Sequence, residues 1–112
     1  MDSRALLIES FHAAVGAADA QKILPPYLPQ PPQGKTLVIG AGKAAAAMAL
    51  AVEQHWPSAA PLDGIAITRY RHGLLTNRIK VIEAGHPVPD ESGEKAAKEI
   101  LRIRGYDARK LR

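Results

Sequence analysis

A short apolar run that ends in two glycines and a lysine limits the possible folds and functions of this chain more than any other feature. The run occupies residues 36–40, and Lys43 leads into four consecutive alanines. Such a run is typical of a buried strand, and the alanines favour a helix. The start of that helix offers unpaired N–H groups and partial positive charge, and glycine lets a bulky anion approach the backbone. The sequence therefore predicts an anion site at Gly40, Ala41, Gly42 and Lys43, or, more simply, a strand–helix turn with an exposed lysine.

The lysine itself favours the first interpretation. We expect Lys43 in the first turn of the helix, where a purely structural helix favours Asp or Glu over a cation. A positive charge in that position indicates a ligand that is negatively charged. The Walker A loop is excluded, because only Ala41 separates the two glycines and an alanine follows the lysine.

A dinucleotide site is a second interpretation of the same loop. Gly40, Gly42 and Ala45 fit the G-x-G-x-x-G/A fingerprint. The acidic ribose partner is expected at the end of the next strand, but Asp63 precedes that predicted strand. Arg69 stands at its end, where an arginine accepts the 2′-phosphate of NADP. The NADP interpretation therefore stays open.

Composition limits the classes of function. The chain has 112 residues and 46% hydrophobic content, much of it alanine, which predicts one domain with a small core. It has no cysteine, which excludes disulfides and thiolate metal sites. The net charge of +4 is spread along the chain without a nucleic-acid-binding motif, so a solvated basic surface or a small anionic substrate explains it. No apolar run suits a membrane span or a signal peptide, so we expect a soluble cytoplasmic protein with neither nucleic-acid nor membrane partners.

Periodicity and turn signals predict strands that alternate with helices. The prolines within 24–34 predict an extended, non-helical connector. Alternation of this kind indicates an α/β fold, a partial doubly wound, Rossmann-like parallel sheet of about three strands with flanking helices. The predicted strands are 36–40, 64–68 and 79–84, and the predicted helices are 4–18, 43–56 and 91–103.

Two helices have predicted inward faces. In the first helix, an apolar face is expected from the near-helical spacing of its large residues. In the last helix, Asp90 is expected at the N-cap. The inward residues predicted are Leu7, Phe11, Val15 and Ala18 for the first helix, and Ala97, Ile100 and Leu101 for the last.

Three segments follow the predicted strands directly, at 40–43, 68–72 and 83–86. Ligands of doubly wound sheets bind beyond the carboxyl ends of the strands, so these segments are expected at one binding edge. The edge then includes His72 and His86. Each of them is a candidate ligand-binding residue or, in the simpler interpretation, a structural histidine in a turn.

Taken together, these segments resemble the N-terminal part of the type-2 glycerate kinase family. Members of that family are also named hydroxypyruvate reductase, and some are encoded with tartrate-utilisation enzymes. Residues 68–73 are similar to a Thr-x-Tyr-Gly-His segment of the family. The resemblance covers roughly residues 4–103, and its other motifs are 38–44 with Met48 and Ala49, and 83–90 with Gly93 and the alanines at 96 and 97.

The resemblance implies a phosphotransferase. The family transfers phosphate from ATP to D-glycerate, giving 2-phosphoglycerate, with a divalent metal ion such as Mg²⁺. It implies a catalytic role for Lys43 in the substrate and phosphate site, and no metal ligand is assigned in this chain. The implied substrate- and phosphate-binding residues are Gly40, Ala41, Gly42, His72 and His86.

Two alternatives remain beside the kinase. One is a hydroxypyruvate reductase that uses NAD(P)H at the glycine loop. The other is a non-enzymatic binding module. Three strands leave more apolar surface than so short a chain covers, so a partner, including a second copy in a homo-oligomer, is expected to cover it.

The chain departs from the family pattern in two places. Arg71 stands where the family usually has glycine. The family also continues beyond the equivalent of Arg112, with a second glycine-rich phosphate segment and a further α/β domain. We therefore expect residues 1–103 to be the first part of a kinase-like domain, left by truncation or frame shift and inactive alone. Residues 104–112 are expected to be a basic, disordered tail.

Overall fold

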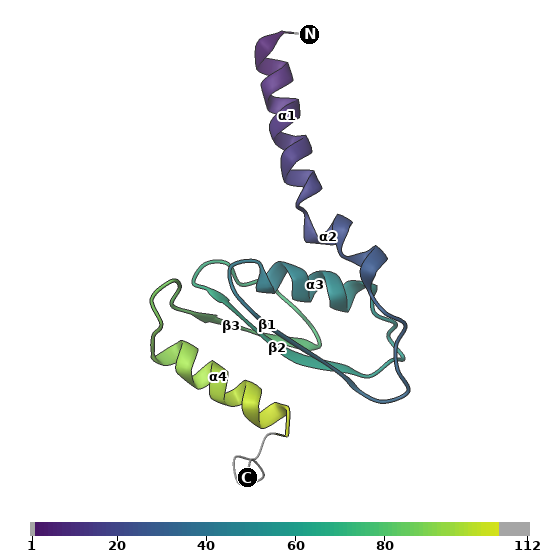
Figure 1. Ribbon diagram of the computed structural model, residues 1–112, viewed down its shortest axis with the longest axis vertical. Coiled ribbons are helices and arrows are strands. Elements are labelled where there is room, and N and C mark those ends of the chain that lie inside the picture. Colours follow the sequence, from purple (N-terminus) through teal and green to yellow (C-terminus); the bar gives the residue numbers. More distant parts are fainter. Residues whose placement is uncertain (1, 106–112) are drawn as a thin grey trace.

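A three-stranded parallel sheet lies at the centre of the computed structural model, which describes residues 2–105. The strand order is β1-β2-β3, with helix α3 on one face of the sheet and helix α4 on the other (Figure 1). This arrangement confirms the predicted α/β class. The elements that form it are β1 (Thr36–Ala41), α3 (Ala45–His55), β2 (Leu62–Arg69), β3 (Ile79–Ala84) and α4 (Glu91–Ile103). The part of the predicted basic tail from residue 106 onward lies outside the described residues.

The bounds of β3 and α4 agree with the prediction, but those of β2 and α3 do not. β2 begins at Leu62, so Asp63 lies inside the strand rather than before it. Its carboxylate is satisfied there, because Lys35 Nζ lies 3.1 Å from Asp63 Oδ2. α3 begins at Ala45, so Lys43 precedes the helix instead of belonging to its first turn. The glycine turn takes two more residues than the prediction allowed.

The proline-rich connector 24–34 begins with a 3₁₀ turn, so the prediction that it contains no helix was wrong there. α2 (Ala20–Ile23) is followed by a 3₁₀ helix, η1 (Pro25–Tyr27). Prolines occupy the first positions of that turn, where a backbone N–H would have no acceptor within the helix, so its absence costs nothing. Its hydrogen bonds come from Tyr27 N to Leu24 O at 3.0 Å and from Leu28 N to Pro25 O at 3.2 Å.

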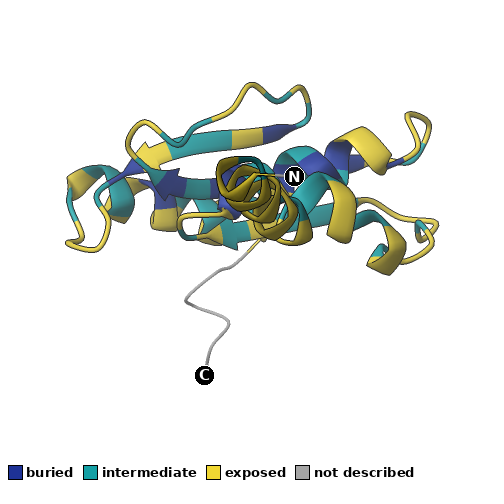
Figure 2. Cartoon of the chain, turned by 90° about the horizontal axis from the view of Figure 1, so that it is seen from above, coloured by how far each residue is buried: buried dark blue, intermediate teal, exposed yellow. Residues whose placement is uncertain are grey.

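The core lies between α3 and the sheet and consists largely of small residues. Ala49 of α3 packs into a cluster with Ala66 of β2 and Ile79 of β3, all at most 2% exposed. Buried residues are concentrated in the strands and along the inner side of α3 (Figure 2). Strands β1 and β2 approach closely at Gly64, where an added Cβ would lie 2.2 Å from Val38 O.

A buried carboxylate closes the connection between β2 and β3. Glu53 of α3 is only 8% exposed, and its side chain accepts hydrogen bonds from three successive backbone N–H groups. The N···O distances are 2.6 Å to Asn77, 2.9 Å to Arg78 and 3.0 Å to Ile79. The guanidinium of Arg78 in turn donates to backbone carbonyls at the end of α3, including Glu53 O at 2.8 Å and Trp56 O at 2.9 Å. This network fixes where β3 begins.

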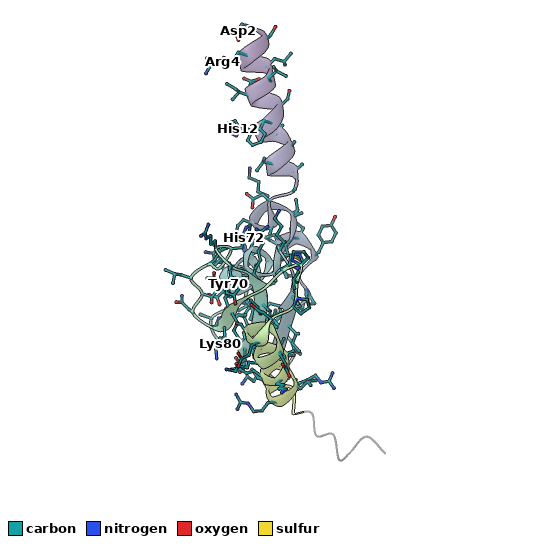
Figure 3. The ribbon with its side chains drawn as sticks, turned by 90° about the vertical axis from the view of Figure 1, so that its left-hand side faces the viewer. Asp2, Arg4, His12, Tyr70, His72 and Lys80 are labelled. Atoms are coloured by element: carbon teal, nitrogen blue, oxygen red, sulfur yellow. The ribbon has the colours of Figure 1, made fainter. Side chains whose placement is uncertain are left out.

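Helix α1 (Ser3–Ala17) forms as predicted but packs differently. Asp2 caps it by accepting from Ala5 N at 2.7 Å. The helix projects away from the sheet, and no residue in it is buried (Figures 1 and 3). The four residues expected to face inward are exposed: Leu7 by 70%, Phe11 by 63% and Val15 by 53%, and Ala18 is exposed as well. Among residues 2–105, no helix is both long and apolar enough to cross a membrane.

The predicted inward face of α4 is also corrected. Ala96 is the residue of α4 that is buried, at 1% exposure, whereas Ala97 and Leu101 are exposed and Ile100 is half-buried. At the start of the helix, Gly93 faces the sheet, because an added Cβ there would lie in van der Waals contact with the Cβ of Ala84, at 3.6 Å. Ala96 is one turn further along on that same side.

Candidate functional site

β1 ends in a glycine turn that leads to the start of α3. Gly42 has a φ of 131°, in the region that L side chains rarely adopt, so glycine suits this position. Its N–H donates to Ile67 O of β2 at 2.9 Å, and its carbonyl accepts from Ala45 N at 3.2 Å. The turn is therefore held both to the neighbouring strand and to the helix.

The start of α3 leaves hydrogen-bond donors unpaired. Its N-cap residue is Ala44, which has no side-chain acceptor. The N–H groups of Ala46 and Ala47 have no acceptor within the described part of the chain. Lys43 stands immediately before this end, is exposed, and forms no ion pair with any described residue. Two donors, the helix dipole and a full positive charge thus occur together, which suits a carboxylate or phosphate oxygen.

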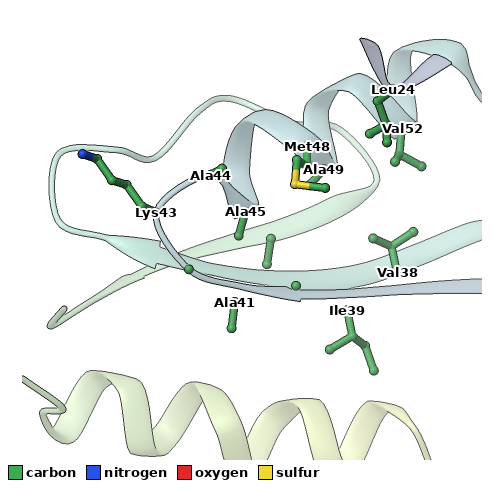
Figure 4. A pocket seen from close by; sticks show the side chains of 13 residues that line it. Leu24, Val38, Ile39, Ala41, Lys43, Ala44, Ala45, Met48, Ala49 and Val52 are labelled. Atoms are coloured by element: carbon green, nitrogen blue, oxygen red, sulfur yellow. The ribbon is translucent and has the colours of Figure 1, made fainter. Parts of the chain in front are cut away.

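An open cleft of about 630 Å³ runs along this turn and the adjacent face of α3. Gly40, Ala41, Gly42 and Lys43 line it together with apolar side chains such as Met48. The Lys43 side chain extends away from Met48 and the other apolar residues of the cleft (Figure 4). The ammonium of Lys43 therefore lies away from the apolar side chains of the cleft and is available to an anion.

A buried hydroxyl ties the glycine turn to the end of β2. Thr68 is 2% exposed, and its Oγ1 donates to the backbone carbonyl of Lys43 at 3.3 Å. Threonine at this position thus holds the lysine loop without reaching the cleft itself.

The loop after β2 is fixed by two carboxylates, one within β3 and one at the N-cap of α4. Tyr70 Oη donates to Asp90 Oδ2 at 2.6 Å, and Arg71 N donates to Glu83 Oε1 at 2.6 Å. Donation from Tyr70 lowers the pKa of Asp90, and the same hydrogen bond raises the pKa of Tyr70. The following residue, His72, lies close to Tyr70 on this loop (Figure 3). An added Cβ at Gly73 would lie 2.8 Å from Glu83 Oε2, so the loop and the carboxylate are in close contact.

The loop after β3 is held to the start of α4. Asp90 Oδ1 accepts from Gly93 N at 3.0 Å, which confirms the predicted N-cap. Ser92 Oγ donates to Glu83 O at 2.7 Å. Asp90 therefore has two roles, as the helix cap and as the acceptor for Tyr70. The sequence indicated only the first, because nothing in a local pattern pairs residues 20 positions apart.

The predicted site residues are brought to one edge of the sheet but not into one cleft. Gly40–Lys43 lines the cleft, whereas His72 and His86 lie on the two neighbouring loops and do not line it. His72 is half-buried and His86 is exposed. Their roles in binding stay predictions. Among residues 2–105, no group of three or more His, Asp and Glu side chains is placed to hold a metal ion.

We predict that Gly42→Val weakens the binding of inorganic phosphate by about tenfold or more, and by more than Lys43→Ala does. Valine is strained at a φ of 131° and would move the backbone donors of the turn. Gly34→Val is the matched control, because an added Cβ there also meets nothing within 4 Å and the position has no positive φ. Isothermal calorimetry measures the affinities. Equal affinity in the wild type and Gly42→Val would show that no anion contacts this backbone.

Comparisons with known proteins agree on one group of relatives. Residues 6–110 match the family described as "Domain of unknown function (DUF4147)". A protein of Agrobacterium vitis named "Putative hydroxypyruvate reductase" is 47% identical over 101 residues, which are 90% of this chain and 23% of that protein. A protein of Pyrococcus horikoshii named glycerate 2-kinase is 51% identical over 71 residues, 63% of this chain and 16% of that protein.

A solved structure gives the same result for the fold. The crystal structure of the PH0495 protein from Pyrococcus horikoshii OT3 superimposes with a TM-score of 0.73 at 36% identity, covering 96% of this chain and 27% of that one. The chain thus spans about a quarter or less of the length of the relatives that it matches.

Proposed function

The chain belongs to the family described as DUF4147, and from this premise we propose that it is the N-terminal part of a glycerate 2-kinase. The proposed reaction of the longer protein is transfer of a phosphoryl group from ATP to D-glycerate, which gives 2-phosphoglycerate. The observation that carries the proposal is the unpaired Lys43 beside the unpaired N–H groups at the start of α3. The relative named glycerate 2-kinase supports it.

The geometry suits phosphoryl transfer because that reaction depends on positioned positive charge more than on covalent catalysis. ATP, when bound, supplies the phosphoryl group. In our proposal, Lys43 and the positive end of the α3 dipole bind an anionic oxygen of substrate or phosphate. Gly42 allows the approach to the backbone, and Thr68 keeps the loop in place. ATP and Mg²⁺ are the proposed cofactors of the longer protein, and the cytoplasm is its proposed compartment. The described residues gather no metal-ligand set, so no step is assigned to a metal ion.

Reduction of hydroxypyruvate with NAD(P)H is the second candidate. The names of the Agrobacterium vitis relatives favour it. The structure weakens the dinucleotide interpretation, because Asp63, the acidic residue at about the right spacing, lies near the start of β2 and pairs with Lys35. The carboxyl end of β2 carries Arg69 instead, which keeps NADP as the nucleotide of that alternative.

We expect the 112-residue chain alone to show no turnover, because its cleft offers one wall of a site. Two assays test this: ATP, Mg²⁺ and D-glycerate in one, and NADPH and hydroxypyruvate in the other. Kinase turnover that disappears in Lys43→Ala would show that the short chain is a complete kinase. Reductase turnover would favour the second candidate.

The same two assays on a chimaera test the function directly. In this chimaera, the 71 residues of this chain that match the Pyrococcus horikoshii glycerate 2-kinase replace their counterparts in that protein. We expect phosphorylation of D-glycerate and no oxidation of NADPH. The unmodified Pyrococcus protein is the control for both assays.

A further inference from the structure

Arg71 has a backbone conformation that an arginine rarely adopts. Its φ is 68°, and it is the non-glycine residue with positive φ among residues 2–105. This conformation costs free energy for any residue with a Cβ and costs glycine little. Arg71 lies two residues after the carboxyl end of β2, at the edge of the sheet where the glycine turn lies. A strained residue at such an edge is a reason to ask what its side chain does.

The surrounding contacts explain how the strained backbone conformation of Arg71 is maintained. The backbone N–H of Arg71 donates to Glu83 Oε1 at 2.6 Å. On one side, Tyr70 is anchored to Asp90 at 2.6 Å, and on the other, His72 N donates to Arg69 O at 3.1 Å. The backbone of the loop is therefore fixed on both sides of the strained residue.

The guanidinium of Arg71 takes no part in this anchoring. The side chain is exposed and lies within 4 Å of no carboxylate in the described chain, although Glu83 contacts its own backbone. Tyr70 Oη donates to one oxygen of Asp90, and the Arg71 N–H donates to one oxygen of Glu83. Neutral donors therefore compete with the guanidinium for both carboxylates. Arg78 shows the contrast, because its guanidinium donates to four backbone carbonyls and serves the fold.

We propose that Arg71 binds an oxygen of the anionic ligand, as a second cation at the edge of the sheet that carries Lys43. A guanidinium forms two parallel hydrogen bonds with a carboxylate or a phosphate, which makes it a specificity-determining group for either. The inference rests on the proposed function, because the ligand in question is the same small anion, D-glycerate or its phosphate ester. It adds a residue that the glycine-turn site does not contain.

NMR titration of the 112-residue chain with inorganic phosphate, and separately with D-glycerate, tests the inference. Arg71→Gly is expected to raise the melting temperature by a few degrees, since it removes the strain, and yet to lower the affinity about tenfold. Arg71→Lys keeps the positive charge but loses the pair of parallel guanidinium donors, and is expected to bind with intermediate affinity. Arg4→Gln, which removes an exposed charge on α1, is the matched control and is expected to leave the affinity unchanged.

The inference is overturned if wild type and Arg71→Gly bind both anions equally, if Arg4→Gln weakens binding as much, or if the wild type shows no perturbation. Lys43→Ala separates the two claims. If Lys43→Ala loses binding and Arg71→Gly does not, the inference fails and the proposed site stands. If Arg71→Gly loses binding and Lys43→Ala does not, the inference stands and the proposed role of Lys43 fails.

Discussion

Replacement of Lys43 by alanine is expected to lower kcat/KM for D-glycerate phosphorylation about a hundredfold to a thousandfold in the chimaera. That loss is the usual cost of removing one positioned electrostatic donor, about 3–4 kcal/mol of transition-state stabilisation. The fold is expected to survive, because Lys43 is exposed and pairs with no described carboxylate.

Steady-state kinetics with purified variants measure the effect. Lys98→Ala is the matched control, because that lysine is 73% exposed and, among the described residues, pairs with Glu94 one turn earlier in α4. Its activity should equal that of the unsubstituted chimaera. Activity of Lys43→Ala within about threefold of that chimaera corresponds to well under 1 kcal/mol and would remove Lys43 from the site.

Replacement of Glu53 by alanine is expected to lower the free energy of unfolding by about 3–5 kcal/mol, enough to unfold much of a small domain. Three backbone N–H groups, of Asn77, Arg78 and Ile79, would lose their acceptor in a buried place. Urea unfolding followed by circular dichroism measures the change. Glu91→Ala, at a side chain that is 82% exposed, should change it little. A loss below about 1 kcal/mol would mean that water replaces the carboxylate at no cost.

The same carboxylate predicts a pH dependence of stability. Burial raises the pKa of Glu53, but hydrogen bonds from the backbone of Asn77, Arg78 and Ile79, with the Arg78 charge, outweigh burial and lower it below its ordinary value of 4.5. The stability that Glu53 contributes is therefore complete above about pH 4.5 and is lost as the pH falls through the lowered pKa. The acid decrease in unfolding free energy should be smaller in Glu53→Gln. An identical decrease in both proteins would assign it to other carboxylates.

Local sequence patterns were sufficient to predict the helices and strands whose ends are set by nearby residues. The cap at Asp90 and the apolar run before Ala84 set the bounds of α4 and β3, and both agree with the structure. Gly42 was recognisable because the turn needs a conformation that glycine adopts freely. The three segments at the carboxyl edge followed from the alternation of strands and helices.

Long-range contacts were not predictable in the same way. Glu53 bonds to residues 24 to 26 positions away, and Tyr70 to one 20 positions away, and neither pairing leaves a periodic signal. Alanine is acceptable on both the buried and the exposed face of a helix, so the choice between Ala96 and Ala97 depended on which face of α4 Gly93 turns toward the sheet. The periodicity of α1 indicated a helix, but it could not indicate that nothing in the described chain covers Leu7 and Phe11.

The product formed by the chimaera from D-glycerate, ATP and Mg²⁺ is the most direct test of the account. Phosphorus NMR identifies that product without coupling enzymes. We predict 2-phosphoglycerate, formed at the expense of ATP and absent when Lys43 is alanine. A folded chimaera that yields no phosphorylated glycerate, or that instead oxidises NADPH with hydroxypyruvate, would contradict the assignment of this chain to a glycerate 2-kinase.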